Sequence, residues 1–183
     1  MANWISNFRR WVGNSLNHLG HTGKCSLSLS PLKEMKSILI LSTAEDSMHI
    51  DAMNVMRTKL MKLCPSAKVT ALLYYTKQKN EEAHISAGDI QYYTNEEFSF
   101  FFKIKSDVII DCFSNEYDVI IVSETTYNKY IDFILPYLRS VLKIGSQSAY
   151  CDKLNIMINS NASDISQFNT DTLNTFEMLF NKH

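Results

Sequence analysis

The chain has 183 residues, a length that one hydrophobic core can serve, so a single main domain is expected. Hydrophobic residues make up 45% and charged residues 20%, which is the composition of a globular protein and excludes a disordered or fibrous chain. The formal net charge of −1 excludes a general electrostatic attraction to nucleic acid, so no nucleic-acid partner is expected.

Charge and hydrophobicity set the N-terminal region apart. Residues 1–36 hold five basic residues and one acidic residue, a net charge of +4, so the remainder carries −5. Apolar residues at helical spacing predict an amphipathic helix over residues 1–20, with Trp4, Ile5, Phe8, Trp11, Val12, Leu16 and Leu19 on one side. Residues 21–34 mix Gly, Ser and Pro, which predicts a linker to one α/β domain over residues 35–183.

The predicted N-terminal helix carries two tryptophans and two arginines. Such a helix suits a groove on a protein partner, a second copy of the chain or a membrane surface, with Trp4, Phe8 and Trp11 as contacts. Its basic charge is small, so packing on its own domain or in a homodimer is favoured over membrane binding.

Targeting signals and cysteine spacing both indicate a cytoplasmic protein. No apolar run reaches the roughly 18 residues that a membrane span needs, and the N-terminus lacks a secretory apolar stretch. The four cysteines show no C-x-x-C pair, and Cys64 and Cys112 follow apolar helical patterns where free buried thiols are common. A reducing compartment is therefore expected.

The first elements of the main domain have a β-α-β order. Ser37 to Ser42 form a short apolar run typical of a strand buried on both faces of a parallel sheet. After a polar turn, Asp46 or Ser47 can cap a helix that ends before Pro65. Residues 68–75 are rich in β-branched and aromatic side chains and predict the second strand.

The second half contains one further clear strand, over residues 117–123. A helix is expected over residues 127–142, kinked or divided by Pro136 because proline lacks the amide donor. Shorter elements are predicted as strands over 89–93, 143–145 and 154–158, a helix start at 94–97, and helices over 108–113 and 171–181. This alternation predicts a three-layer, Rossmann-like α/β fold with a mostly parallel sheet flanked by helices.

Ligands of open parallel sheets bind beyond the carboxyl ends of the strands. Polar side chains follow the predicted strands there, and the candidate ligand contacts are Ser42, Thr43, Asp46, Ser123, Thr125 and Ser146. The turn after the first strand has no glycine, so its backbone cannot approach a pyrophosphate as a G-x-G-x-x-G turn does. A dinucleotide site is not expected, and these residues serve equally well as caps and turn formers.

Metal and catalytic patterns are weak. An acidic cluster able to bind a cation or transfer protons would form from Glu45, Asp46, Asp51 and Glu124 if the first and central strands were neighbours, although solvated turn acids are the simpler interpretation. His49 is the only histidine placed near that crevice. The group formed by His18, His21 and Cys25 lacks a fourth metal ligand. The sequence predicts no catalytic residue, no metal and no cofactor.

The order and spacing of the elements carry a family resemblance. Together with the N-terminal helix, the runs over residues 35–42, 68–75, 116–122 and 142–145 resemble a family of small uncharacterised proteins from Bacteroidetes, which implies no activity. The run from Cys64 to Thr70, Cys-Pro-Ser-Ala-Lys-Val-Thr, is similar to the first β-α-β unit of heptosyltransferase-type glycosyltransferases. That second resemblance covers only this first β-α-β unit, in the N-terminal half of such two-domain enzymes.

Three functions remain open from the sequence. The leading expectation is a non-enzymatic interaction or small-ligand-binding domain, with homodimerisation through the N-terminal helix as one form of interaction. The first alternative is a small enzyme or nucleotide-sugar binder that uses the crevice at the strand ends. The second is a protein attached to a membrane surface.

Overall fold

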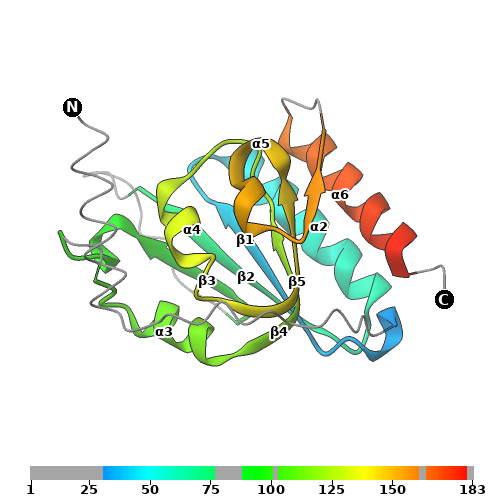
Figure 1. Ribbon diagram of the computed structural model, residues 1–183, viewed down its shortest axis with the longest axis horizontal. Helices are drawn as coiled ribbons and strands as arrows, with labels where there is room; N and C mark the ends of the chain where they lie inside the picture. Colours follow the sequence, from blue (N-terminus) through cyan, green and yellow to red (C-terminus); the bar gives the residue numbers. More distant parts are fainter. Residues whose placement is uncertain (1–30, 77–87, 101–102, 161–163, 181–183) are drawn as a thin grey trace.

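The computed structural model describes residues 31–76, 88–100, 103–160 and 164–180. They form a six-stranded sheet in the order β3-β2-β1-β4-β5-β6, and the named strands pair in parallel throughout (Figure 1). The predicted Rossmann-like α/β class is therefore confirmed. The predicted helix over residues 1–20, with Trp4, Phe8 and Trp11, lies outside the described residues.

The strands are short and mostly buried. Their bounds are β1 Ser37–Thr43, β2 Lys68–Tyr75, β3 Ile90–Thr94, β4 Glu116–Val122, β5 Arg139–Ser146 and β6 Ile156–Ile158. The two runs that the sequence marks most clearly, β1 and β4, are neighbours at the centre of the sheet. A strand flanked on both sides by others and covered on both faces needs apolar residues at every position, which explains these unbroken runs.

Helices cover both faces of the sheet. They are α2 Ser47–Leu63, α3 Asp107–Ser114, α4 Lys129–Ile134, α5 Gln147–Tyr150 and α6 Ile165–Phe180, with 3-10 turns η1 Leu32–Glu34, η2 Asn95–Glu97 and η3 Cys151–Lys153. Figure 1 shows α2 and α6 side by side on one face, and α3 and α4 on the other.

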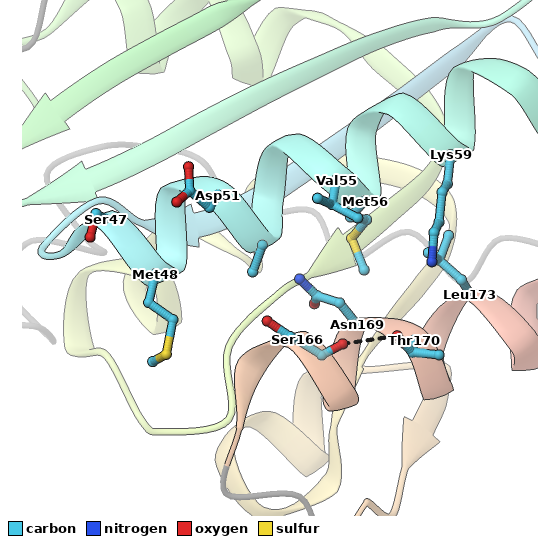
Figure 2. Close-up of a pocket in the computed structure, with 11 residues that line it drawn as sticks. Ser47, Met48, Asp51, Val55, Met56, Lys59, Ser166, Asn169, Thr170 and Leu173 are labelled. Carbon is cyan, nitrogen blue, oxygen red and sulfur yellow. Dashed lines mark hydrogen bonds between the residues drawn. The ribbon is translucent and has the colours of Figure 1, made fainter.

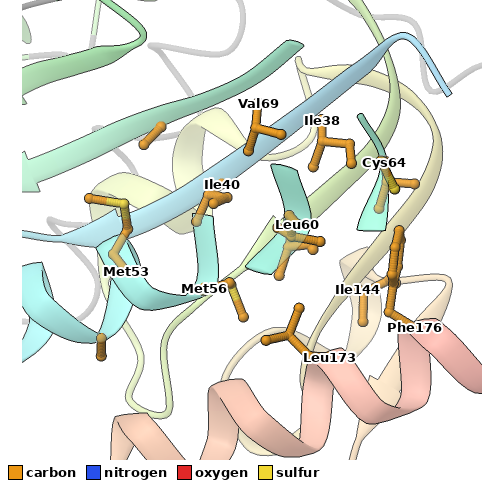
Figure 3. Close-up of a cluster of buried hydrophobic side chains, with 14 of the residues drawn as sticks. Ile38, Ile40, Met53, Met56, Leu60, Cys64, Val69, Ile144, Leu173 and Phe176 are labelled. Carbon is orange, nitrogen blue, oxygen red and sulfur yellow. The ribbon is translucent and has the colours of Figure 1, made fainter. Parts of the chain in front are cut away.

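Two apolar clusters, one on each face, hold these layers together. Ile38 and Ile40 of β1 face the α2 and α6 side, whereas Leu39 and Leu41 face the α3 and α4 side, as the two-residue period of a strand requires. Figure 3 shows the first cluster, in which Met56 and Leu60 of α2 meet Leu173 of α6 below the strands. Leu32 belongs to the same cluster, so the core extends into the segment expected to be a linker.

The expected helix over residues 127–142 is wrong in its second half. Helix α4 ends at Ile134, Pro136 lies in the turn that follows, and β5 begins at Arg139. Proline ends the helix because it offers no amide donor, and Val141, Leu142 and Ile144 then enter the sheet between β4 and β6. The short strand expected over residues 143–145 is the end of this longer one.

Two other expectations have clear outcomes. Helix α6 begins at Ile165, six residues before the predicted start at Asp171. Cys64 and Cys112 are free and buried, as expected.

Among the helices of the described ranges, none has the length and apolar character that a membrane span requires.

Candidate functional site

The centre of the sheet is the point at which the strand order reverses, between β1 and β4. The chain moves outward from β1 through β2 to β3, and then crosses back to β4 on the other side of β1. Leu41 pairs with Val122, so Ser42 and Ser123 meet at the carboxyl ends of the two strands. The amide of Ser123 donates to the carbonyl of Leu41 at 2.8 Å. Open α/β sheets bind ligands at such a reversal point.

The side chain of Glu124 fills this reversal point. The residue is 1% exposed, and Oε1 accepts hydrogen bonds from the backbone amide of Thr43 at 2.5 Å and from Ser42 Oγ at 3.0 Å. Backbone amides at the turn after a first strand are the donors that phosphate-binding folds offer to an anion. Here the protein's own carboxylate occupies one of them, which disfavours a phosphate at the same place.

Burial raises the pKa of Glu124, and its hydrogen bonds from Thr43 and Ser42 and the nearby His49 only partly offset this effect. His49 lies one turn into α2, with Nε2 4.0 Å from Glu124 Oε2. Its Nδ1 is 2.7 Å from Asp46 Oδ1. Asp46 also caps α2 by accepting from the His49 amide, and these bonds lower the pKa of Asp46. The three side chains form a short polar row at the start of α2.

A cleft of about 460 Å³ lies between α2 and α6. Helix α2 contributes Ser47, Met48, Asp51, Ala52, Val55, Met56 and Lys59, and α6 contributes Ser166, Asn169, Thr170 and Leu173 (Figure 2). The lining therefore combines apolar side chains with hydroxyl groups from both helices and one charged side chain toward each end. A cleft of this size is adequate for a small organic ligand.

Asn169 is the one lining side chain that is polar and buried, with only 4% of its surface exposed. Its Oδ1 accepts a 2.7 Å hydrogen bond from Ser123 Oγ. Its Nδ2 has no hydrogen-bond partner within the part of the chain that the structure describes. Figure 2 shows this amide nitrogen directed from α6 toward α2. A buried donor without a partner costs about 1–3 kcal/mol, so an acceptor placed beside Nδ2 would stabilise the protein.

Hydrogen-bonding groups connect this cleft to the reversal point. Asn169 holds Ser123 Oγ, and Ser42 Oγ lies 3.0 Å from both the Ser123 carbonyl and Glu124 Oε1. Asn169 is thus tied to the centre of the sheet, and its amide orientation is fixed from behind. A ligand that met Nδ2 would find the donor already in place.

The structure brings together some of the predicted ligand contacts. Ser42, Thr43 and Ser123 meet around Glu124, and Asp46 joins them through His49. The other two stand apart: Thr125 is half-buried on the loop after β4, and the hydroxyl of Ser146 lies 2.8 Å from that of Ser148. None of the six lines the α2–α6 cleft.

The four acids considered for a cation site are dispersed. Glu45 accepts from the Thr76 hydroxyl at 3.0 Å, Asp51 lines the α2–α6 cleft, and Glu124 is enclosed at the reversal point. Within the described ranges, no group of three or more His, Cys, Asp or Glu side chains is arranged to hold a metal ion.

Sequence reasoning missed Asn169 because the predicted terminal helix began at Asp171. The signal was nevertheless present: Ile165, Phe168, Leu173 and Phe176 recur at helical spacing, and this periodicity places Asn169 on the buried side. A lone amide on an apolar helix face indicates a position where a polar partner is required.

Comparison with known proteins identifies the family but no activity. The chain has no significant match among curated proteins or among solved structures. The model of a family described as a family of unknown function (DUF6913) matches residues 9–179. This match spans both helices of the cleft and all six strands, and the chain belongs to this family.

Proposed function

We propose that this protein is a non-enzymatic domain that binds a small ligand in the cleft between α2 and α6. The observation that carries the proposal is the unpartnered Nδ2 of Asn169, which is buried, held from behind by Ser123 and directed into the cleft. A bound carbonyl or carboxylate oxygen would satisfy this donor. The fold supports the assignment because the cleft adjoins the point where the strand order reverses.

The chemistry of the lining favours binding over catalysis. The cleft offers hydroxyl groups from Ser47, Ser166 and Thr170, but its lining includes no histidine or cysteine. A hydroxyl without an adjacent base is a weak nucleophile. The acid–base pair nearest to the cleft, His49 and Glu124, is not part of the lining.

The test is thermal unfolding of the full chain with a panel of amino acids, short peptides, sugar phosphates, nucleotides and divalent metal ions. A ligand that binds only the native state raises the melting temperature by mass action. We expect a shift for at least one carbonyl-bearing compound, and its loss in Asn169→Leu. Asn174→Leu, at an exposed position on the same helix outside the cleft, is the matched control and should keep the shift. A panel without any shift contradicts the proposal.

A second candidate is a small enzyme or nucleotide-sugar binder at the reversal point itself. It is favoured by the 4.0 Å approach of His49 Nε2 to Glu124 Oε2, since a carboxyl with a raised pKa beside a histidine can transfer protons. For this function, the panel compound that stabilises the protein would lose its effect in His49→Ala and keep it in Asn169→Leu. The reverse pattern supports the α2–α6 cleft.

A further inference from the structure

Two side chains of opposite charge lie at different points along the α2–α6 cleft. Along α2, Asp51 and Lys59 are separated by eight residues, which corresponds to about 12 Å along a helix axis. Both side chains are exposed, and neither has an ion-pair partner among the residues that the structure places. In Figure 2 the ammonium group of Lys59 extends toward Leu173 of α6. Figure 2 shows the Asp51 carboxylate on the side of α2 away from α6, so Asp51 lies at the rim of the cleft near one end and Lys59 reaches across it near the other.

Between these two charges the polar side chains of the lining are Asn169 and Thr170, and the Thr170 hydroxyl donates to the Ser166 carbonyl at 3.0 Å. Val55, Met56 and Leu173 form its sides, and Asn169 Nδ2 supplies a single unpartnered donor. A complementary ligand has a cationic end for Asp51, an anionic end for Lys59, an acceptor oxygen between them and apolar groups along its length. A phosphate-rich ligand fits poorly because Lys59 is the only basic side chain in the lining.

Building on the proposed function, we infer that the α2–α6 cleft binds a short apolar peptide with free termini, its ammonium group toward Asp51 and its carboxylate toward Lys59. An extended tripeptide spans about 10 Å at 3.3–3.6 Å per residue, close to the separation of about 12 Å between Asp51 and Lys59 along the axis of α2. A backbone carbonyl of the peptide accepts from Asn169 Nδ2. Met48 and Met56 in the lining adapt to different apolar side chains, so we expect selectivity to depend on the length and the termini of the peptide.

Calorimetric titration of the full chain with trimethionine, its N-acetyl form and its C-terminal amide tests the inference. We expect the free tripeptide to bind, and each blocked form to bind about two- to fivefold more weakly, as loss of an exposed ion pair predicts. Asp51→Lys and Lys59→Asp should each weaken binding of the free tripeptide. The double variant should recover it, because the peptide can then bind in the opposite direction.

Two further variants keep the test interpretable. Asn169→Leu should weaken all three peptides alike, and Val55→Trp, at an exposed position on the rim, should block the cleft without disturbing the core. Equal binding of free and blocked peptides, no binding of trimethionine, or no recovery in the charge-swapped double variant overturns the inference. If another panel compound still depends on Asn169, the proposed ligand-binding function stands and only the peptide assignment fails. If no compound binds, both fail.

Discussion

Glu124, on the loop after β4, accepts a 2.5 Å hydrogen bond from the backbone amide of Thr43 at the end of β1. The two residues are 81 positions apart in the chain, and their contact closes the centre of the sheet where the strand order reverses. In this way a buried carboxylate of the protein, itself 1% exposed, holds the place at which related folds receive an anion. The cleft between α2 and α6, where we propose that a ligand binds, lies beside this position.

Glu124 makes stability depend on pH. Burial raises its pKa above the ordinary value of 4.5, so the native state holds this proton more tightly than the unfolded chain does. The resulting stabilisation is complete below about pH 4.5 and is lost as the pH rises through the raised pKa of the folded state. Glu124→Gln should lack this loss in urea unfolding from pH 4 to pH 8. Glu116→Gln, at an exposed position, should keep the wild-type profile, and parallel profiles for Glu124→Gln and wild type contradict the prediction.

Lys143 should give a trend of the opposite sign at alkaline pH. Burial lowers its pKa from 10.5 to about 8, and its Nζ donates to the Leu135 carbonyl at 2.9 Å. The native state therefore holds the proton less tightly, so stability rises as the pH increases from about 8 toward 10.5. Between pH 8 and pH 10, wild type should gain stability relative to Lys143→Met in urea unfolding. The variant Lys62→Met, at an exposed position, should follow the wild-type pH profile. If the difference in stability between wild type and Lys143→Met also stays constant from pH 8 to pH 10, the lowered pKa of Lys143 is contradicted.

The ion pair between Lys153 and Asp132 is buried, with side-chain exposures of 18% and 6%. Lys153 also donates to the Asp132 carbonyl at 3.0 Å, and Tyr127 donates to the Asp132 carboxylate at 2.9 Å. Lys153→Met should lower the free energy of unfolding by about 3–5 kcal/mol, because Asp132 is left charged and buried. The exposed Arg139–Glu116 pair offers the control, because Arg139→Met should change the free energy of unfolding by only about 0–1 kcal/mol. Similar losses in the two variants would count against a special role for burial.

Gly145 allows β5 to approach its neighbours closely. A Cβ at this position would lie 3.0 Å from Val122 Cβ and 3.2 Å from Leu154 Cδ1. Gly145→Ala should therefore destabilise the protein by about 1–3 kcal/mol in chemical denaturation. In a Leu154→Ala background the same substitution should cost less, because one of the two contacts is gone. Equal costs in both backgrounds would place the strain elsewhere.

The predicted N-terminal helix is testable by deletion. If the linker predicted over residues 21–34 separates this helix from the α/β domain, removal of residues 1–20 should leave the melting transition of that domain intact. If this helix joins two copies of the chain, the mass measured by light scattering should fall to that of a monomer. Flotation with anionic vesicles at low and moderate salt separates membrane attachment through Trp4, Phe8 and Trp11 from dimerisation. An unchanged mass together with unchanged partner capture contradicts a contact role for the helix.

The sequence alone determined the central strands and the helix between them. Unbroken apolar runs predicted β1 and β4 because a doubly covered central strand needs apolar residues on both faces. Pro65 indicated the end of α2, and its cap was narrowed to Asp46 or Ser47, of which the structure has Asp46. The same local reasoning failed after Pro136, where β-branched residues in β5 follow a helix pattern closely enough to be assigned to it. It also placed Ser42, Thr43 and Ser123 at the strand ends without identifying what fills the space between them.

Only the tertiary structure decided that Glu124 fills the reversal point and that Asn169 is the unpartnered donor beside it. Strand order and the packing of α6 on α2 bring residues together that are 46 positions apart, as in the Ser123–Asn169 hydrogen bond. Local periodicity can show that a side chain is buried, but it does not reveal which groups surround it. The hydrogen bonds and the cleft depend on those surroundings, so they follow from the arrangement of the layers.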